Sequence, residues 1–425
     1  MVKLTGFEIQ YGNPHGVFHA GETLTGRVAV QLSEPMKMRA ITLLIFARAK
    51  VHWTKTKGGS KNRRTVHYRA EEVYINQVVR LYGDGESSQM HPEGIHVYDF
   101  SMALPNNLPS SMEGAYGYVR YYCQATIDRP WKFDHNTKKP FTVLSILDLN
   151  TQPIDFRNSV EGQDHTSVDC CCCVSGECTA LFRINKRAFV PGEPIVIYAV
   201  VENKSNTDMQ GSRVSIKQYT DFYGVSDSWL SSGTPKPKQS SCFVASKEHG
   251  PIPAGKTDIW ENEELIVPPL PPSQLVGCNI INISYVVKFY VNVNYGSDLK
   301  VATDLLIGTI PLHSVYTQYQ GPPVYPNAPP PGEDVVTTQP GAFSQPPSAP
   351  SLPATLPPPS YEEVVTGRVP IVEEGESEYM HGDKEFAPRY TYYNWKQSGF
   401  GSPTPPSAPT PSQPADPAPG ASNQI

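Results

Sequence analysis

Apolar and polar residues alternate over many short stretches of this sequence, and long helical periodicity is hard to find. The clearest stretch has an apolar side chain at every second position: Ile281, Ile283, Tyr285, Val287, Phe289, Val291 and Val293. Val28, Val30 and Leu32 repeat the pattern near the N-terminus. Successive side chains of a strand point to opposite faces, so each such segment buries one face and exposes the other. The pattern predicts an all-β protein with two antiparallel layers packed together.

The alternating region contains an internal repeat. Phe18-x-x-Gly21-Glu22 is echoed by Phe189-x-x-Gly192-Glu193, and Leu108-Pro109-x-Ser111 is echoed by Leu270-Pro271-x-Ser273. A Phe-x-Ile pair also precedes each Gly-Glu turn, at 7–9 and at 182–184. Matched turns in the same order, each leading into an apolar strand, predict two similar β-sandwiches. We expect one at residues 1–150 and the other at 179–315, joined by a linker at 151–178.

Proline content separates the tail from the body. Of the 43 prolines, 24 lie between Pro322 and Pro419, whereas all eight cysteines lie at or before Cys278. A segment so rich in Pro, Ser, Gly and Glu cannot bury enough apolar surface to offset the entropy lost on ordering. Residues 316–425 are therefore predicted to form a disordered, Pro-rich tail.

The expected cellular compartment follows from the lack of two kinds of apolar segment. The first ten residues lack the apolar run of a signal peptide, and no run of eighteen apolar residues occurs. We therefore expect a cytoplasmic protein with reduced cysteines. A formal net charge of -6 argues against nucleic acid as a partner.

Several segments of the body resemble the arrestin fold. The N-terminal half resembles an arrestin N-terminal domain at 7–9 (FEI), 20–28 (AGETLTGRV), 113–121 (EGAYGYVRY), 129–131 (RPW) and 139–143 (KPFTV). The second half resembles an arrestin C-terminal domain at 191–193 (PGE), 260–261 (WE), 278–281 (CNII) and 307–312 (IGTIPL). The resemblance implies a body of two arrestin-type antiparallel β-sandwiches, and segment 358–366 (PPSYEEVVT) is similar to the tails of the alpha-arrestin branch.

Two stretches of the tail fit the PPxY pattern that WW domains bind. They are Pro322-Pro323-Val324-Tyr325 and Pro358-Pro359-Ser360-Tyr361. Consecutive prolines preform a polyproline II helix for an aromatic groove, and a second pocket takes the Tyr. The second copy is preferred because acidic residues follow its Tyr, whereas Pro326 restricts the backbone of the first. Ala387-Pro388-Arg389-Tyr390 is a degenerate third form that we expect to bind weakly.

Two PSAP sequences also lie in the tail, and two interpretations of them stay open. They consist of Pro347, Ser348, Ala349 and Pro350, and of Pro406, Ser407, Ala408 and Pro409. Such a motif is similar to the late-domain motif that the UEV domain of ESCRT-I binds. The alternative is coincidence, because four-residue matches arise easily in a tail built of Pro, Ser and Ala.

A cysteine cluster occupies the predicted linker. Its members are Cys170, Cys171, Cys172 and Cys173. Consecutive residues of an extended chain alternate sides, so they cannot converge on one zinc ion, and no metal is expected. One interpretation is a linker with small, half-buried thiols that runs into the first strand of the second domain; the other is S-palmitoylation at a membrane.

A basic stretch lies between two predicted strands of the first domain. Its principal residues are Lys55, Lys57, Lys61, Arg63 and Arg64. The simpler interpretation is a solvated hairpin loop. The functional one is contact with anionic lipid headgroups or with acidic cargo, in which each basic residue adds about 1 kcal/mol near a charged surface.

The chain carries none of the G-x-x-x-x-G-K, G-x-S-x-G or H-E-x-x-H motifs, so neither an enzyme nor a cofactor is expected. The resemblance implies an adaptor that recruits WW-domain HECT-type ubiquitin ligases to receptors or transporters at the plasma membrane and endosomes. It promotes their ubiquitination, endocytosis and sorting. The alternative is an arrestin-fold coat subunit, like the one in retromer, which sorts cargo without recruiting a ligase. The paired PPxY motifs favour the adaptor.

Overall fold

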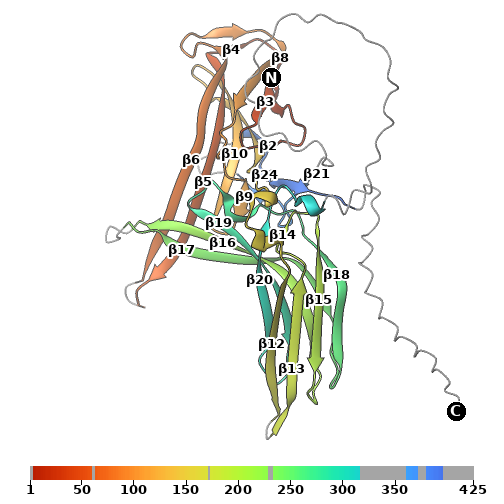
Figure 1. Cartoon of the computed structure of the whole chain (residues 1–425). Coiled ribbons are helices and arrows are strands. Elements are labelled where there is room, and N and C mark those ends of the chain that lie inside the picture. The colour runs from red at the N-terminus through yellow and green to blue at the C-terminus, as the bar shows by residue number, and fades with distance from the viewer. Residues whose placement is uncertain are drawn as a thin grey trace, which may run out of the picture.

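The body consists of two β-sandwiches, one above the other in the view of Figure 1. The computed structural model describes residues 3–59, 63–170, 173–227, 233–315, 360–371 and 380–395. Within these residues strands predominate, with short 3-10 turns at η1 (Leu149–Thr151), η2 (Ile154–Arg157) and η3 (Ser273–Leu275) and a helical turn at 313–315. The all-β prediction is confirmed.

The N-terminal sandwich packs a three-stranded sheet against a larger one. The smaller sheet has the order β1 (Leu4–Tyr11), β3 (Thr23–Leu32), β8 (Gly94–Ala103). The larger has the order β6 (Arg64–Gly83), β5 (Ala40–Lys57), β10 (Gly117–Asp128), β11 (His135–Leu144), β2 (Val17–His19), with β9 (Met112–Gly114) beside β10. A two-stranded ribbon is formed by β4 (Met36–Met38) and β7 (Gln89–His91).

The C-terminal sandwich repeats this plan. One sheet has the order β12 (Val160–Cys170), β13 (Cys173–Ile184), β15 (Pro194–Asn203), β18 (Thr257–Ile266). The other has the order β14 (Ala188–Phe189), β20 (Leu299–Ile307), β19 (Ile281–Asn292), β16 (Gly211–Ser226), with β17 (Lys236–His249) also paired to β16. The predicted alternation is confirmed in β19, where Ile281, Ile283 and Tyr285 are buried and the residues between them are not.

The internal repeat is a repeat of hydrogen bonds. In each Gly-Glu turn the Glu carboxylate accepts from the amide three residues earlier, His19 N to Glu22 Oε2 at 2.7 Å and Val190 N to Glu193 Oε2 at 3.2 Å. The two glycines have φ angles of 84° and 91°, which only glycine adopts readily. The same turn therefore closes both sandwiches.

The Leu-Pro loops repeat in the same way. A buried Tyr hydroxyl donates to the Pro carbonyl of each loop, from Tyr121 to Pro109 at 2.6 Å and from Tyr285 to Pro271 at 2.8 Å. The loop serine accepts a strand amide in each domain: Val143 N bonds Ser111 Oγ and Ile307 N bonds Ser273 Oγ, both at 2.9 Å. Both domains thus hold this loop between two strands with the same two bonds.

The two sandwiches share a sheet. Strand β6 of the first pairs with β16 of the second at Arg69↔Val225 and Tyr68↔Ser226, so the two larger sheets are continuous. The chain between the domains adds further contacts, including a parallel bridge between Asp148 and Ile310.

Residues 151–178, predicted to be a linker, are instead largely part of the second sandwich. They hold the 3-10 turn η2, the whole of β12 and the start of β13. Strand β12 (VEGQDHTSVDC) was not predicted because its less exposed positions include Gly162, Asp164 and Thr166. Exposure therefore alternates along the strand, but residue type does not.

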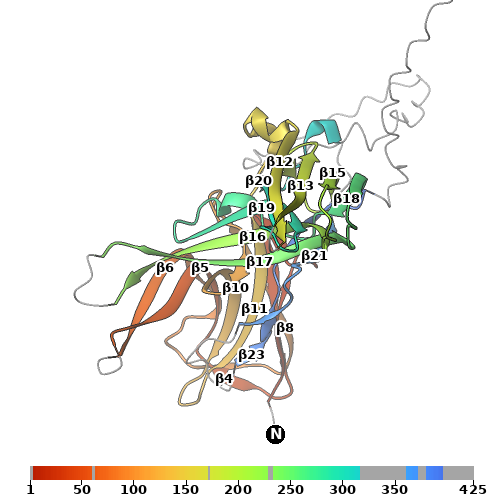
Figure 2. The ribbon, with the colours of Figure 1, turned by 90° about the horizontal axis from the view of Figure 1, so that it is seen from below.

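The predicted disordered tail contains ordered strands. Residues 360–371 and 380–395, called the docked tail below, lie against the body near the joint between the sandwiches (Figures 1 and 2). Its strands are β21 (Ser360–Glu363), β22 (Val369–Pro370), β23 (Met380–Gly382), β24 (Glu385–Phe386) and β25 (Arg389–Tyr392). Composition did not predict these strands, because the aromatic residues that anchor this segment are few within a long Pro-rich tail.

Candidate functional site

Tyr361, the Tyr of the second PPxY copy, belongs to a strand of the docked tail. Strand β21 pairs antiparallel with β25, and Tyr361 lies opposite Thr391. The hydroxyl of Ser360 donates to the Tyr392 carbonyl at 3.1 Å. The backbone just after the prolines is therefore held in a ladder.

The Tyr361 ring packs against the N-terminal sandwich. Its centroid lies 6.0 Å from that of His15 and 6.4 Å from that of His19, next to the first Gly-Glu turn. The side chain is half-buried at the edge of an apolar cluster formed by Val17, Leu144, Val364, Ala387 and Tyr390. Burial, and then the charge of Glu22, raises the pKa of Tyr361. The phenol that a WW domain would bind is thus partly covered by the body.

Tyr390 anchors the docked tail to the same sandwich. Its side chain is 2% exposed, and its hydroxyl donates to the Ser111 carbonyl at 2.9 Å. The neighbouring Arg389 amide donates to Thr142 Oγ1 at 3.1 Å. Burial raises the pKa of Tyr390 well above its usual value, so the ring stays a neutral hydrogen-bond donor. This residue of the degenerate third motif therefore has a structural partner.

Tyr393 and Trp395 anchor the tail to the other sandwich. The Tyr393 amide donates to the Pro191 carbonyl at 3.0 Å, and its hydroxyl donates to the Thr309 carbonyl at 2.8 Å. Its ring stacks on Trp395 with centroids 5.4 Å apart. Both rings join an apolar cluster made mostly by the second domain, which consists of Leu147, Leu149, Ala188, Val190, Leu306, Leu312 and Val315. The aromatic cluster of the tail is the part that crosses from one domain to the other.

Polar contacts complete the docking near β11. Strand β23 adds in parallel to β11, with Thr137 opposite His381. Within the tail, Glu363 binds Arg368 at 2.6 Å and Arg389 at 3.4 Å, and these contacts, that of Arg368 first, lower the pKa of the Glu363 carboxyl. A hollow of about 340 Å³ remains between the tail and residues 10–16 and 139–142 of the body. Packing is therefore looser here than around Tyr390.

Most other predicted tail sites lie outside the described residues. These are Pro322, Pro323 and Tyr325 of the first PPxY copy, Pro358 and Pro359 of the second, and both PSAP sequences at 347–350 and 406–409. Their use stays a prediction.

The cysteine cluster lies at the turn of a hairpin. Cys170 ends β12, Cys173 begins β13, and the two residues pair in the ladder; Cys171 and Cys172 lie outside the described residues. Strands β12 and β13 run away from the N-terminal sandwich in Figure 1. Within the described part of the chain, no group of His, Cys, Asp and Glu is arranged to hold a metal ion.

The basic stretch forms the end of the β5–β6 hairpin. Lys55, Lys57, Arg63 and Arg64 are exposed, and Lys61 lies outside the described residues. A second hairpin, β16–β17, adds Lys236, which is exposed, and Lys238, which is partly buried; its strand β16 pairs with β6. Sequence reasoning missed these lysines because only the fold brings the second hairpin beside the first. We call Lys55, Lys57, Arg63, Arg64 and Lys236 the basic hairpin surface.

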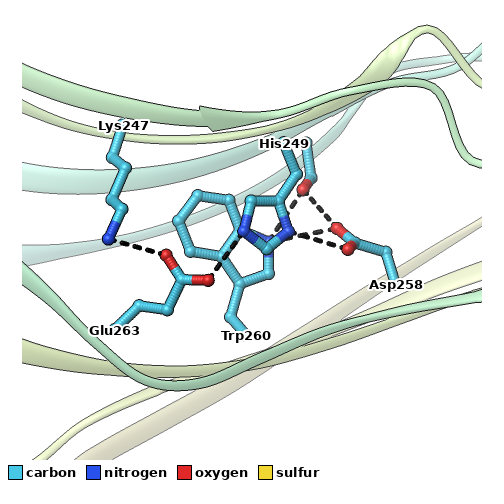
Figure 3. Close-up of polar contacts among 6 residues, drawn as sticks. Lys247, His249, Asp258, Trp260 and Glu263 are labelled. Atoms are coloured by element: carbon cyan, nitrogen blue, oxygen red, sulfur yellow. Dashed lines mark hydrogen bonds and ion pairs between the residues drawn. The ribbon is translucent and has the colours of Figure 1, made fainter.

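One polar cluster of the second domain has the residue types of a catalytic site (Figure 3). His249 is bonded by Nδ1 to Asp258 and by Nε2 to Glu263, each at 2.8 Å, and stacks on Trp260 at 3.9 Å. Burial alone would lower the pKa of His249, but the two carboxylates outweigh it and raise the pKa. Ser212 donates to Asp258 at 2.6 Å, and both His nitrogens are engaged by carboxylates. The cluster therefore ties β17 to β18, and neither His249 nitrogen is left to take a proton from the Ser212 hydroxyl.

Comparison with known proteins covers the body. The model of the arrestin (or S-antigen) N-terminal domain matches residues 7–150, and that of the C-terminal domain matches residues 175–312. Arrestin domain-containing protein 17 of Caenorhabditis elegans is 32% identical over 73% of this chain and 72% of its own length. Thioredoxin-interacting protein is 28% identical over 72% of this chain, covering 74% of the mouse protein and 75% of the human protein. Among the described residues, no helix is long and apolar enough to cross a membrane.

Proposed function

The chain belongs to the alpha-arrestins, a family of non-catalytic arrestin-domain adaptors, and from that premise we propose that it recruits WW-domain HECT-type ubiquitin ligases to membrane-protein cargo. The β-sandwich body engages the cargo, a receptor or transporter. The PPxY motifs of the tail bring the ligase within reach of the lysines of that cargo. Ubiquitination then promotes endocytosis and endosomal sorting. The protein acts in the cytoplasm, at the periphery of the plasma membrane and endosomes.

The pair of PPxY motifs is the observation that carries this proposal. Two prolines followed by a Tyr two positions on present a preformed extended segment to an aromatic groove. The sequence holds two such copies, ending at Tyr325 and Tyr361, beyond the last residue of the matched arrestin domains. An arrestin-fold coat subunit has no need of paired WW ligands, so the motifs favour the ligase adaptor.

Three secondary contacts belong to the same proposal. The basic hairpin surface would meet anionic headgroups, because exposed Lys and Arg near a charged bilayer gain attraction within a Debye length. The hairpin turn with Cys170 and Cys173 would carry S-palmitoyl groups. The PSAP sequences would bind the UEV domain of ESCRT-I once cargo reaches the endosome.

The test is a calorimetric titration of the full chain with a four-WW array from a HECT-type ligase. Wild type is compared with Tyr325→Ala, Tyr361→Ala and the double variant. We expect weaker binding by each single variant and none by the double variant. Undiminished binding by the double variant, or no binding by wild type, would remove the ligase and leave the coat-like sorting subunit as the better explanation.

A further inference from the structure

We propose that the body of this protein and a WW domain compete for Tyr361, so that the second PPxY copy recruits a ligase only after the docked tail leaves the body. The competition presupposes the WW recruitment proposed above. It adds that the motif is masked within the same chain and that its affinity is set by how often the tail is released.

The first step concerns the Tyr361 side chain. A WW domain takes the Tyr of its ligand in a pocket, with the preceding prolines in a groove. In the structure the ring instead faces His15 and His19. Since one ring cannot occupy two pockets, the docked and ligase-bound states exclude each other.

The second step concerns the backbone. Strand β21 is paired with β25 through four residue pairs, from Ser360↔Tyr392 to Glu363↔Arg389. A WW ligand is a polyproline II segment whose backbone makes no ladder. Entering the WW groove therefore requires this ladder to open, which we propose happens as β25 leaves the body.

The third step concerns what holds the tail in place. Tyr390 bonds a carbonyl of the first domain, at Ser111, and Tyr393 bonds a carbonyl of the second, at Thr309. Neither residue belongs to the second PPxY copy. Docking is thus fixed by anchors separate from the motif, and the anchors can be changed without altering the ligand that a WW domain sees.

The fourth step concerns two features that disfavour the docked state. The hollow of about 340 Å³ lies between the tail and the N-terminal sandwich. The Thr391 hydroxyl, opposite Tyr361, is buried without a hydrogen-bond partner among the described residues. An unpaired buried hydroxyl disfavours the docked state, because water satisfies that group after release.

Linkage gives the expected size of the effect. If only a fraction of molecules has a released tail, the apparent dissociation constant rises by the inverse of that fraction. A docked population roughly ten times the released one weakens binding about tenfold, which corresponds to about 1.4 kcal/mol.

The experiment uses the full chain with Tyr325→Ala, so that binding reports Tyr361. This parent is compared with the same chain carrying Tyr390→Ala and, as a matched control, Asn394→Ala, which alters an exposed residue between two buried anchors. Each is titrated with the four-WW array. We expect Tyr390→Ala to bind about tenfold more tightly than the parent, and Asn394→Ala to match the parent within twofold. Because Tyr390 belongs to the degenerate third motif, its loss can only weaken a direct contact, so a gain must come from release.

A second measurement needs no substitution in the anchors. Hydrogen exchange of the Arg389 and Tyr393 amides, which are bonded to Thr142 and Pro191, is followed in wild type with and without saturating array. Faster exchange in the presence of the array supports competition. Unchanged exchange while the array is bound through Tyr361 overturns it, whatever the variants do.

The two proposals fail differently. Equal affinity of the parent and Tyr390→Ala, both lost on adding Tyr361→Ala, overturns masking and leaves ligase recruitment intact. No binding by the parent or by Tyr390→Ala means that Tyr361 is not a WW ligand. Ligase recruitment through Tyr361 and its masking by the body are then both refuted.

Discussion

Trp395→Ala is the substitution that most directly measures how the tail is held. The indole is 6% exposed, stacks on Tyr393 and belongs to the apolar cluster that includes Leu147 and Val190. Truncating such a ring in a core that must stay assembled costs about 3–5 kcal/mol. Here the loss in stability has an upper limit, because the tail can leave while the two sandwiches keep their own cores. This upper limit is the free energy of docking of the tail on the body.

Because of this upper limit, the losses in free energy of unfolding caused by Trp395→Ala and Tyr390→Ala should not add. Two independent core truncations would together destabilise the protein by about 6–10 kcal/mol. If either one releases the tail, the second has nothing left to remove, and the double variant should match the more damaging single variant within about 0.5 kcal/mol.

The assay is urea unfolding of wild type, both single variants and the double variant, followed by far-ultraviolet circular dichroism. Exchange of the Tyr393 amide reports tail release in the same samples. Additive losses of several kcal/mol, or an unfolded double variant, would refute the reasoning and make the tail an integral part of the core.

Three further predictions test the body. Tyr121→Phe and Tyr285→Phe each leave a buried Pro carbonyl without its donor, so each should destabilise its domain by about 1–3 kcal/mol in calorimetry; no loss in either domain would contradict the repeat. The pKa of His249 is raised above 6.5 in the folded state, so its stabilisation is fully present below that pH and disappears as pH rises through the folded pKa. His249→Gln should therefore lower the unfolding midpoint more near pH 6 than near pH 9, and an equal loss would show that the charge is irrelevant. Lys57→Gln with Arg64→Gln should weaken partition onto anionic vesicles roughly 30-fold, about 1 kcal/mol per charge, whereas exposed Lys256→Gln should change it little.

The sandwich strands were predictable because the alternation of apolar and polar residues along one strand shows by itself which side chains are buried. In β19, Ile283 and Val287 are buried and their neighbours are not. The two-residue period of apolar side chains predicts this burial without any tertiary information. The Gly-Glu and Leu-Pro turns were equally visible, since each needs particular residues at fixed positions. Strand β12 was not predictable, because polar residues interrupt its apolar period. It is recognised as a strand from its pairing with β13.

The docked tail was beyond sequence reasoning for a different reason. Tyr390, Tyr393 and Trp395 are aromatic residues in a proline-rich context, but their partners lie far away along the chain. Tyr390 bonds Ser111, a separation of 279 residues, and nothing local specifies that pairing. Composition averages over the whole tail, so it hides the three side chains that anchor this short segment.

The parallel addition of β23 to β11 has a consequence for self-association. At Asn136, Thr137 and Lys138 the tail covers the outer side of β11, which would otherwise present unpaired amide and carbonyl groups. An open strand edge is a template for another extended chain. When the tail leaves, the same event that frees Tyr361 uncovers that edge. Under the competition proposed for Tyr361, the form that binds a ligase would therefore also be the form best able to accept a strand from another molecule.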